Sequence, residues 1–345
     1  MTTFDRLATS AAPTASLEQA LADIRAGKFV VLVGAADRRS EGTLTIAAQH
    51  CDADAVAYMA RHGRGIISLC LTEARCDELG LPPMTRTNTS TYQAAFTISI
   101  EAREGVSTGI SAADRARTIA VAVDPSSTAR DLVSPGHIFP LRARPGGVLA
   151  RVAHTEGAVD LAALAGLQPA AVICGILTPD GSMAGPAEIE SVASQLDLTV
   201  LAVEDLVAHR RRLEQWIVPA GERLLRTTTG ELHAFSFAEE HTGLTHLALV
   251  KGDASLEGPV FVHEECAGGD VFGALDCGCG EALQGALETL ERTGSGVLVY
   301  VAREADERRL QDVVLACERN GDSISPKAIE LARQVLHALG SPAAP

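Results

Sequence analysis

The sequence is poor in aromatic residues and has no excess of positive charge. Only 3% of its 345 residues are Phe, Trp or Tyr, so the hydrophobic cores must be built from Ala, Val, Leu and Ile. The net charge of −15 argues against non-specific binding to nucleic acid. No apolar run reaches the roughly 20 residues that a membrane span requires, and the amino terminus lacks the basic and apolar regions of a signal peptide. We therefore expect a cytoplasmic protein without nucleic-acid or membrane partners.

The eight cysteines do not form a dense disulfide pattern, and three of them gather in one Gly-rich segment. Their spacing is Cys-x10-Cys-x-Cys, and the residues are Cys266, Cys277 and Cys279. Three thiolate ligands that leave one position open suit a zinc site. Three unrelated buried thiols are the alternative. Scattered cysteines with one metal-like cluster fit a reducing cytoplasm.

Apolar runs and amphipathic stretches alternate along the first two thirds of the chain. Helices are predicted at residues 17–26, 112–123 and 186–196, and the region ends in a segment with basic residues at 204–215. Strands are predicted at residues 29–33, 66–71, 96–100, 172–174 and 199–203. A polar loop is expected at residues 34–43, and a further loop around His137. This alternation of strands and helices indicates an α/β or α+β domain.

A second region follows a connector around residues 217–221. Its predicted elements are a helix at 281–292, a charged and helix-like final stretch, and strands at 232–237, 246–250, 260–262 and 296–301. A chain of 345 residues is long enough for two domains with full cores. We predict a flexible arm at residues 1–15, a first domain at 16–213 and a second domain at 222–345.

Polar segments of the first domain carry candidate site residues. Residues 37–43 follow a buried strand, a position where ligand-binding loops are common. Ser111 and Asp114 open a helix, and Ser111 suits its N-cap. His137 stands in a segment rich in Pro and Gly. Taken singly, these segments also fit surface charge, a simple helix cap or a solvated His.

A further candidate segment runs from Arg151 to Glu156. Arg151 and Thr155 suit a phosphate group, and His154 suits a metal ion or the transfer of a proton. Taken together, the ordered segments resemble 3,4-dihydroxy-2-butanone-4-phosphate synthase over about residues 15 to 212. The segments that carry the resemblance are residues 88–92, 108–115, 135–137, 146–149, 154–156, 164–166, 180–183 and 204–206.

This resemblance implies a fold, a reaction and a set of site residues. The family has an α/β sandwich fold, forms homodimers with an active site shared across the dimer, and uses magnesium to convert ribulose 5-phosphate to a four-carbon ketone phosphate and formate. The implied catalytic residues are Glu41, His137 and His154, and we add Arg39 as a candidate that stands where the family has a metal ligand. The implied substrate-binding residues are Arg38, Asp114, Arg151, Thr155 and Glu156.

Several positions depart from the family pattern where its chemistry is placed. The family's acidic loop Asp-Arg-Glu-Asn-Glu-Gly-Asp has Arg39 in place of a metal-binding Glu and Thr43 in place of the last Asp. Gly175 replaces another Glu, and Ser68 replaces a Cys. Magnesium needs hard oxygen ligands, and the fixed cation of Arg39 opposes a metal cation. These departures predict weak or no magnesium binding in the first domain.

The second region resembles GTP cyclohydrolase II over residues 222 to about 310. In that family three Cys bind zinc, and a zinc-bound water opens the guanine imidazole ring. Cys266, Cys277 and Cys279 match those ligands one for one. The family's nucleotide-contacting Gln-Glu-Gly-Arg segment corresponds to residues 303–306, where Asp306 replaces the Arg and opposes a triphosphate. The family's later catalytic segments have no counterpart.

The sequence therefore predicts an α/β domain of the synthase type, followed by a smaller α+β zinc domain that resembles a truncated GTP cyclohydrolase II. The predicted function is a divergent member of the riboflavin-biosynthesis family, with non-standard chemistry on a sugar phosphate such as ribulose 5-phosphate and with cyclohydrolase activity lost. In that reading His154 or His137 is the general base, Glu41 or Glu156 assists, and Arg39 stabilises an enediolate. A non-catalytic dimeric scaffold with structural zinc and an ordinary formate-releasing synthase are the alternatives.

Overall fold

The structure is a computed structural model that describes residues 15–34, 41–252, 258–275, 277–303 and 324–340. Contacts between residues divide the chain into two compact units, with the boundary between Arg210 and Arg211. The predicted flexible arm lies almost wholly outside the described residues. No helix among the described residues is both long enough and apolar enough to cross a membrane.

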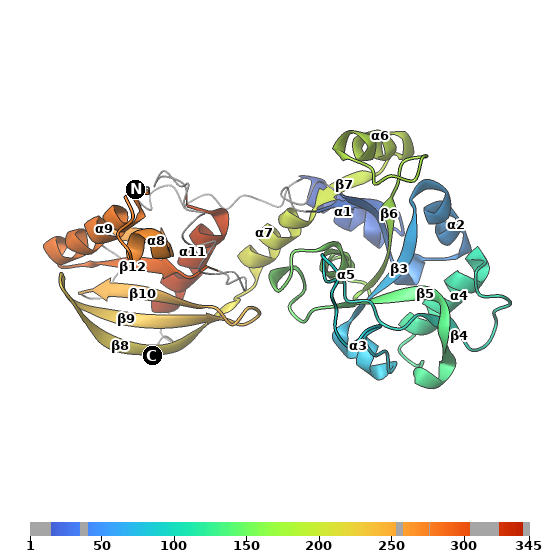
Figure 1. The fold of residues 1–345 in the computed structure, drawn as a ribbon, viewed down its shortest axis with the longest axis horizontal. Coiled ribbons are helices and arrows are strands. Elements are labelled where there is room, and N and C mark those ends of the chain that lie inside the picture. Colours follow the sequence, from blue (N-terminus) through green and yellow to red (C-terminus); the bar gives the residue numbers. More distant parts are fainter. Residues whose placement is uncertain (1–14, 35–40, 253–257, 276, 304–323, 341–345) are drawn as a thin grey trace. The chain divides into compact units, whose positions relative to one another are not determined.

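The first unit is built on one mixed sheet of seven strands (Figure 1). The strand order is β4-β5-β3-β6-β2-β1-β7. The strands β1 and β7 are parallel, as are β3 and β5, whereas the other pairs are antiparallel. The bounds are β1 Val30–Val33, β2 Gly42–Ala47, β3 Arg64–Thr72, β4 Ile100–Ala102, β5 Leu132–Ala143, β6 Ala170–Ile176 and β7 Thr199–Ala202.

Helices cover both faces of this sheet, which confirms the α/β class (Figure 1). Side chains alternate between the two faces along each strand. On one face Leu69 and Ile46 pack with Met59 of α2 and Ile119 of α4, and α6 packs there through Ile189. The opposite face contacts α5. The helix bounds are α1 Ala15–Arg25, α2 Ala53–His62, α3 Glu73–Glu78, α4 Ala112–Val123, α5 His154–Leu164, α6 Pro186–Leu196 and α7 Val203–Leu213.

The sequence predicts most of these elements, and two predictions are wrong. Residues 96–100 do not form a strand: β4 covers only Ile100–Ala102, and Phe96 makes one isolated bridge to Leu141. The segment around His137 is not a loop but lies within β5. The Pro and Gly residues of this segment are typical of a loop, so the local sequence does not suggest a strand. Strand β4 lies very close to it, since a Cβ atom at Gly136 would overlap the backbone of Ile100.

The second unit has a five-stranded sheet with the order β11-β12-β10-β9-β8. Only β11 and β12 are parallel. The helix α9 packs on one face, where Leu290 meets Leu249 and Leu298, and α11 contacts β8, β11 and β12. The bounds are β8 Ile217–Thr227, β9 Gly230–Glu239, β10 Thr245–Lys251, β11 Val260–Glu264, β12 Gly296–Val301, α8 Ala267–Asp270, α9 Cys279–Thr293 and α11 Pro326–Gly340.

The predicted connector at residues 217–221 is instead the first half of β8. Pro219 and Gly221 resemble loop residues in the sequence, but they flank a shift of register between β8 and β9. An edge strand accepts Pro and a bulge because one side of its backbone has no strand partner. The hairpin partner β9 supplies the regular pairing that the local sequence of β8 does not suggest.

Candidate functional site

The first candidate site lies where β1 ends, β2 begins and α5 begins. His154 is the first residue of α5, and its Nε2 donates a hydrogen bond to the backbone carbonyl of Glu41 at 3.0 Å. The imidazole lies close to Gly34, where a Cβ atom would stand 3.1 Å from the ring. The structure thus places His154 beside the backbone of Glu41, and the hydrogen bond does not involve the Glu41 carboxylate. The predicted Arg38 and Arg39 lie outside the described residues.

Two of the departures from the family pattern are neighbours on the sheet. Thr43 of β2 and Gly175 of β6 are directly paired across the two strands. Thr43 and Ser68 are buried. A Cβ atom added at Gly175 would meet no atom within 4 Å, so the space that a longer side chain would occupy is open. The altered positions 43 and 175 therefore form one local feature.

The first turn of α5 is suited to an anion. The N-cap residue, Ala153, makes no side-chain hydrogen bond to the helix, so its amino-terminal N–H groups lack a side-chain cap. Thr155 lies in this turn and is 6% exposed. The guanidinium of Arg151 is adjacent: its Nη2 donates to the carbonyl of Tyr92 at 2.7 Å, and its Nη1 lies 3.5 Å from Glu156 Oε2. A phosphate at this turn would meet both a helix terminus and a fixed cation.

Glu156, which the resemblance predicts to bind substrate, is enclosed by protein atoms within one chain. Its side chain is 0% exposed, and its Oε1 accepts a hydrogen bond from the backbone N–H of Arg144 at 3.0 Å. Burial raises the pKa of its carboxyl, while the nearby Arg151 opposes that shift. The carboxyl faces protein atoms rather than an open site. Periodicity alone does not reveal this, because Glu156 follows His154 and Thr155 directly in the chain.

Asp114 is also occupied by its own loop. The carboxylate is 6% exposed and accepts hydrogen bonds from the Ser107 hydroxyl at 2.8 Å, the Ser107 N–H at 3.1 Å and the Gly109 N–H at 3.0 Å. These bonds, those from Ser107 first, lower the pKa of Asp114. Ser111 caps α4 as predicted. Asp114 therefore shapes the turn before α4, and its predicted contact with substrate stays a prediction.

His137 stands apart from His154 within one chain. It lies on β5, and its Nδ1 is 3.2 Å from Glu101 Oε1 on β4. The sheet order places β3, β6 and β2 between β5 and β1. Adjacent strands are about 4.8 Å apart, so His137 and the end of β1 are separated by roughly 15–20 Å across the sheet. One chain alone does not bring the two predicted catalytic histidines together.

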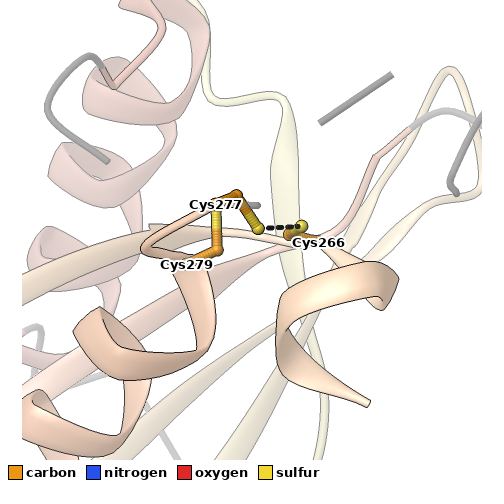
Figure 2. A group of neighbouring side chains, drawn as sticks. All are labelled: Cys266, Cys277 and Cys279. Atoms are coloured by element: carbon orange, nitrogen blue, oxygen red, sulfur yellow. Dashed lines mark hydrogen bonds between the residues drawn. The ribbon is translucent and has the colours of Figure 1, made fainter. Parts of the chain in front are cut away.

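The second candidate site is the cysteine cluster of the second unit (Figure 2). The sulfur atoms of Cys266, Cys277 and Cys279 all lie within 4.8 Å of one another, and all three residues are buried. The Sγ atoms of Cys266 and Cys277 are 3.8 Å apart, too far for a disulfide. Sulfurs bound tetrahedrally to one zinc ion at about 2.3 Å lie about 3.8 Å apart. The donor set and its spacing therefore fit zinc.

The starts of two helices, the short α8 and the longer α9, hold these cysteines. Cys266 precedes α8 and its sulfur accepts a bond from the Gly269 N–H at 3.4 Å, while Cys279 is the first residue of α9. A Cβ atom at Gly269 would stand 2.8 Å from the backbone N of Gly280. Glycine at position 269 therefore permits the close approach of the two helix starts.

Asp270 connects the cysteine cluster to the sheet, although the sequence analysis assigns it no role. Its carboxylate accepts hydrogen bonds from the Cys266 N–H at 2.8 Å, from His263 Nε2 at 2.9 Å and from the Tyr300 hydroxyl at 2.8 Å. These donors lie before α8, on β11 and on β12. A cavity of about 500 Å³ adjoins the cluster, and Asp270, Cys277 and Glu281 are among its lining residues. The position of Asp270 one helical turn after Cys266 is the only sequence signal for this role.

Comparisons with known proteins agree with both resemblances. The family model for 3,4-dihydroxy-2-butanone 4-phosphate synthase matches residues 18–209, and that for GTP cyclohydrolase II matches residues 219–342. The riboflavin biosynthesis protein RibBA of Salinispora arenicola is 46% identical over 288 residues, which cover 83% of this chain and 69% of that protein.

Solved structures show the same relationship. RibBX of A. baumannii, a two-domain 3,4-dihydroxy-2-butanone 4-phosphate synthase, has a TM-score of 0.77 and 36% identity, covering 94% of this chain and 90% of that chain. A 3,4-dihydroxy-2-butanone 4-phosphate synthase in complex with two magnesium ions has a TM-score of 0.54 and 35% identity, covering 57% of this chain and 96% of that chain.

The comparisons overturn the prediction of a divergent reaction with cyclohydrolase activity lost. Relatives that are 41–46% identical over more than four fifths of the chain carry the name riboflavin biosynthesis protein RibBA, which supports the ordinary function of the family. The prediction gave too much weight to a few positions, 39, 43, 175 and 306 among them. The family is enzymatic, so the non-catalytic scaffold does not stand either, and the chain is an enzyme. It belongs to the riboflavin-biosynthesis family in which a 3,4-dihydroxy-2-butanone 4-phosphate synthase domain is fused to a GTP cyclohydrolase II domain.

Proposed function

We propose that the first unit catalyses the 3,4-dihydroxy-2-butanone-4-phosphate synthase reaction, which converts ribulose 5-phosphate to the four-carbon ketone phosphate and formate. The observation that carries this proposal is the meeting of Glu41, His154 and the uncapped first turn of α5 beside Arg151. This arrangement places the imidazole of His154 next to a phosphate-binding turn. None of the seven described cysteines is in a disulfide, which suits the cytoplasm as the location of the protein.

In this proposal the phosphate of the substrate binds the first turn of α5, where Arg151 and Thr155 supply a cation and a hydroxyl. His154 then stands at the carbon skeleton. Its Nε2 carries a proton, because the carbonyl of Glu41 can only accept the hydrogen bond between them. Proton removal next to the substrate carbonyl gives an enediol, and His154 is the residue placed to move that proton.

The residues at the magnesium positions match the family pattern only in part. The carboxylate of Glu41 is present, whereas positions 39, 43 and 175 are Arg, Thr and Gly. Because these residues do not supply the family's full set of oxygen ligands, we derive no step through magnesium. The metal requirement is therefore an experimental variable in the assay below.

A homodimer would complete this site. His137 lies several strands away from His154 in one chain, so a second copy must supply it if it acts there. Analytical ultracentrifugation tests this part of the proposal: we expect a dimer, and a monomer with full activity would contradict it.

The test of the reaction is formate release from ribulose 5-phosphate, with and without added magnesium. We expect formate from the unmodified chain and a large loss for His154→Ala and Arg151→Ala. Asp160→Asn is the matched control on the same helix, since Asp160 pairs with Arg210 rather than with Arg151. No formate under any metal condition, from a folded dimer, would contradict the proposal.

The cysteine cluster favours a second candidate reaction, that of GTP cyclohydrolase II, for residues 219–342. We assign zinc to Cys266, Cys277 and Cys279, whose spacing fits that ion. Bound zinc supplies a Lewis acid there. Both reactions release formate, so the same assay with GTP in place of ribulose 5-phosphate tests it. Zinc-dependent formate from GTP that Cys277→Ser abolishes would support this candidate, and its absence from the zinc-loaded chain would exclude it.

A further inference from the structure

The two carboxylate oxygens of Glu156 differ in their hydrogen bonding. Oε1 accepts the Arg144 N–H at 3.0 Å, which ties α5 to the end of β5. Oε2 is buried and has no hydrogen-bond partner. An unsatisfied buried carboxylate oxygen is costly, so a group that can donate to it is expected nearby.

The guanidinium of Arg151 is that group. Its Nη1 lies 3.5 Å from Glu156 Oε2, just beyond a good hydrogen-bond distance, while its Nη2 is held at 2.7 Å by the carbonyl of Tyr92. Arg151 therefore has two anchors on different segments. The Tyr92 carbonyl is neutral, whereas Glu156 is a carboxylate that can hold a guanidinium through a charge-assisted bond.

We propose that Glu156 is the positioning residue for Arg151: it holds the guanidinium at the first turn of α5 in the orientation that receives the substrate phosphate. This inference rests on the proposed function, because that function is what gives Arg151 its phosphate. Glu156 is fully buried, so it acts through Arg151 and not by touching the substrate. Its negative charge also keeps the cation at this place when no phosphate is bound.

A second carboxylate on α5 provides a closely matched control. Asp160 lies one helical turn after Glu156 and also accepts a backbone N–H, that of Val148 at 2.8 Å. It also pairs with an arginine, but with Arg210, at 2.7 Å. Loss of the negative charge from Asp160 thus removes the same kind of buried contact from the same helix without touching Arg151.

The experiment measures ribulose 5-phosphate binding and turnover in Glu156→Gln, Asp160→Asn and Arg151→Ala, and in the double variant Arg151→Ala/Glu156→Gln. Loss of one charge-assisted contact should raise KM and Kd about tenfold in Glu156→Gln, while kcat changes by no more than about twofold. Asp160→Asn should leave both constants unchanged. In the Arg151→Ala background the Glu156→Gln change should have no further effect on Kd, because its effect passes through Arg151.

The inference would be overturned by an unchanged Kd in Glu156→Gln, by an equal loss in Asp160→Asn, or by an undiminished effect of Glu156→Gln in the Arg151→Ala background. Circular dichroism and thermal unfolding establish that each variant is folded. If Glu156→Gln does not fold, Glu156→Asp is used instead. Its shorter side chain withdraws the carboxylate from Arg151, so it should also raise Kd. Failure of the proposed function is distinguishable, because then the unmodified chain itself neither binds ribulose 5-phosphate nor releases formate.

Discussion

The two candidate sites of this protein are built over very different distances along the chain. The thiol cluster draws its three ligands from 14 consecutive residues, Cys266 to Cys279, in which two helix starts are brought together by glycine. The site around His154 draws on the ends of β1 and β2 and the start of α5, more than 100 residues apart. A local site depends on its own segment, whereas a long-range site depends on the sheet that carries it.

The largest expected effect is the loss of zinc affinity when one ligand is removed from the cysteine cluster. Replacing Cys277 by Ser removes one of three thiolate ligands, and we expect zinc affinity to fall by more than about 100-fold, since changes outside the ligand set alone cost about 10–100-fold. Zinc content after dialysis, measured by atomic emission, checks this. Cys174→Ala in the first unit is the control, because that buried thiol lies outside the cluster. Equal zinc in both variants would show that the cluster is not the zinc site.

A smaller effect on zinc binding is expected for Asp270, which connects the cysteine cluster to the sheet. Asp270 joins Cys266 to His263 and Tyr300 through three hydrogen bonds. Asp270→Asn should weaken zinc binding by about 10-fold, because the Cys266 backbone loses a charged acceptor. Competition with a zinc chelator measures it. Tyr300→Phe, which removes one bond and leaves the carboxylate, should weaken zinc binding less; an effect as large as that of Asp270→Asn would shift the role from Asp270 to Tyr300.

Magnesium binding at the site around His154 should strengthen when the carboxylates of the family pattern are introduced there. The double variant Thr43→Asp/Gly175→Glu adds two oxygen ligands at paired positions, and the open space at Gly175 accommodates the longer addition. We expect magnesium affinity to rise by about tenfold or more. Isothermal titration with magnesium measures the change. Gly175→Gln separates side-chain volume from charge, and an equal gain from it would contradict a ligand effect.

The smallest effect concerns stability in the second unit, away from both sites. Burial alone would raise the pKa of Glu239, but hydrogen bonds from His246 and Thr242 and the nearby Lys327 ammonium bring it down to about 2. An unfolded Glu titrates near 4.3. The stabilisation is therefore complete above about pH 4.5 and is lost as pH falls toward 2.

Glu239→Gln should lower the free energy of unfolding by about 1–3 kcal/mol at pH 7 and by roughly half as much near pH 3. Urea unfolding at the two pH values measures this. Glu231→Gln, at an exposed position on the same strand, is the control. A loss that does not depend on pH would mean that packing, not charge, accounts for the role of Glu239.

The comparison of the two sites also explains what the sequence could predict. The spacing of Cys266, Cys277 and Cys279 was sufficient to predict that the thiols lie together, because helix starts separated by a short Gly-rich turn must be near each other. The helices α4 and α6 were predicted at their observed bounds from caps and periodicity. These features depend on interactions between residues that are close in sequence.

Features that depend on distant partners were not predictable in the same way. The strand β5 was taken for a loop because Pro135 and Gly136 suit a turn, and only the close approach of β4 explains them. The burial of Glu156 against Arg144 depends on how α5 lies on the sheet, which the sequence around Glu156 does not indicate. The hydrogen-bond partners of Asp114 are likewise set by the shape of the preceding turn.

The most direct test of this account is formate release from ribulose 5-phosphate by the unmodified chain, compared with Arg151→Ala and Asp160→Asn at saturating magnesium. The account predicts formate production that falls by more than about tenfold in Arg151→Ala and persists in Asp160→Asn. It would be contradicted if the folded, unmodified chain released no formate, or if Arg151→Ala retained full activity at substrate concentrations below KM.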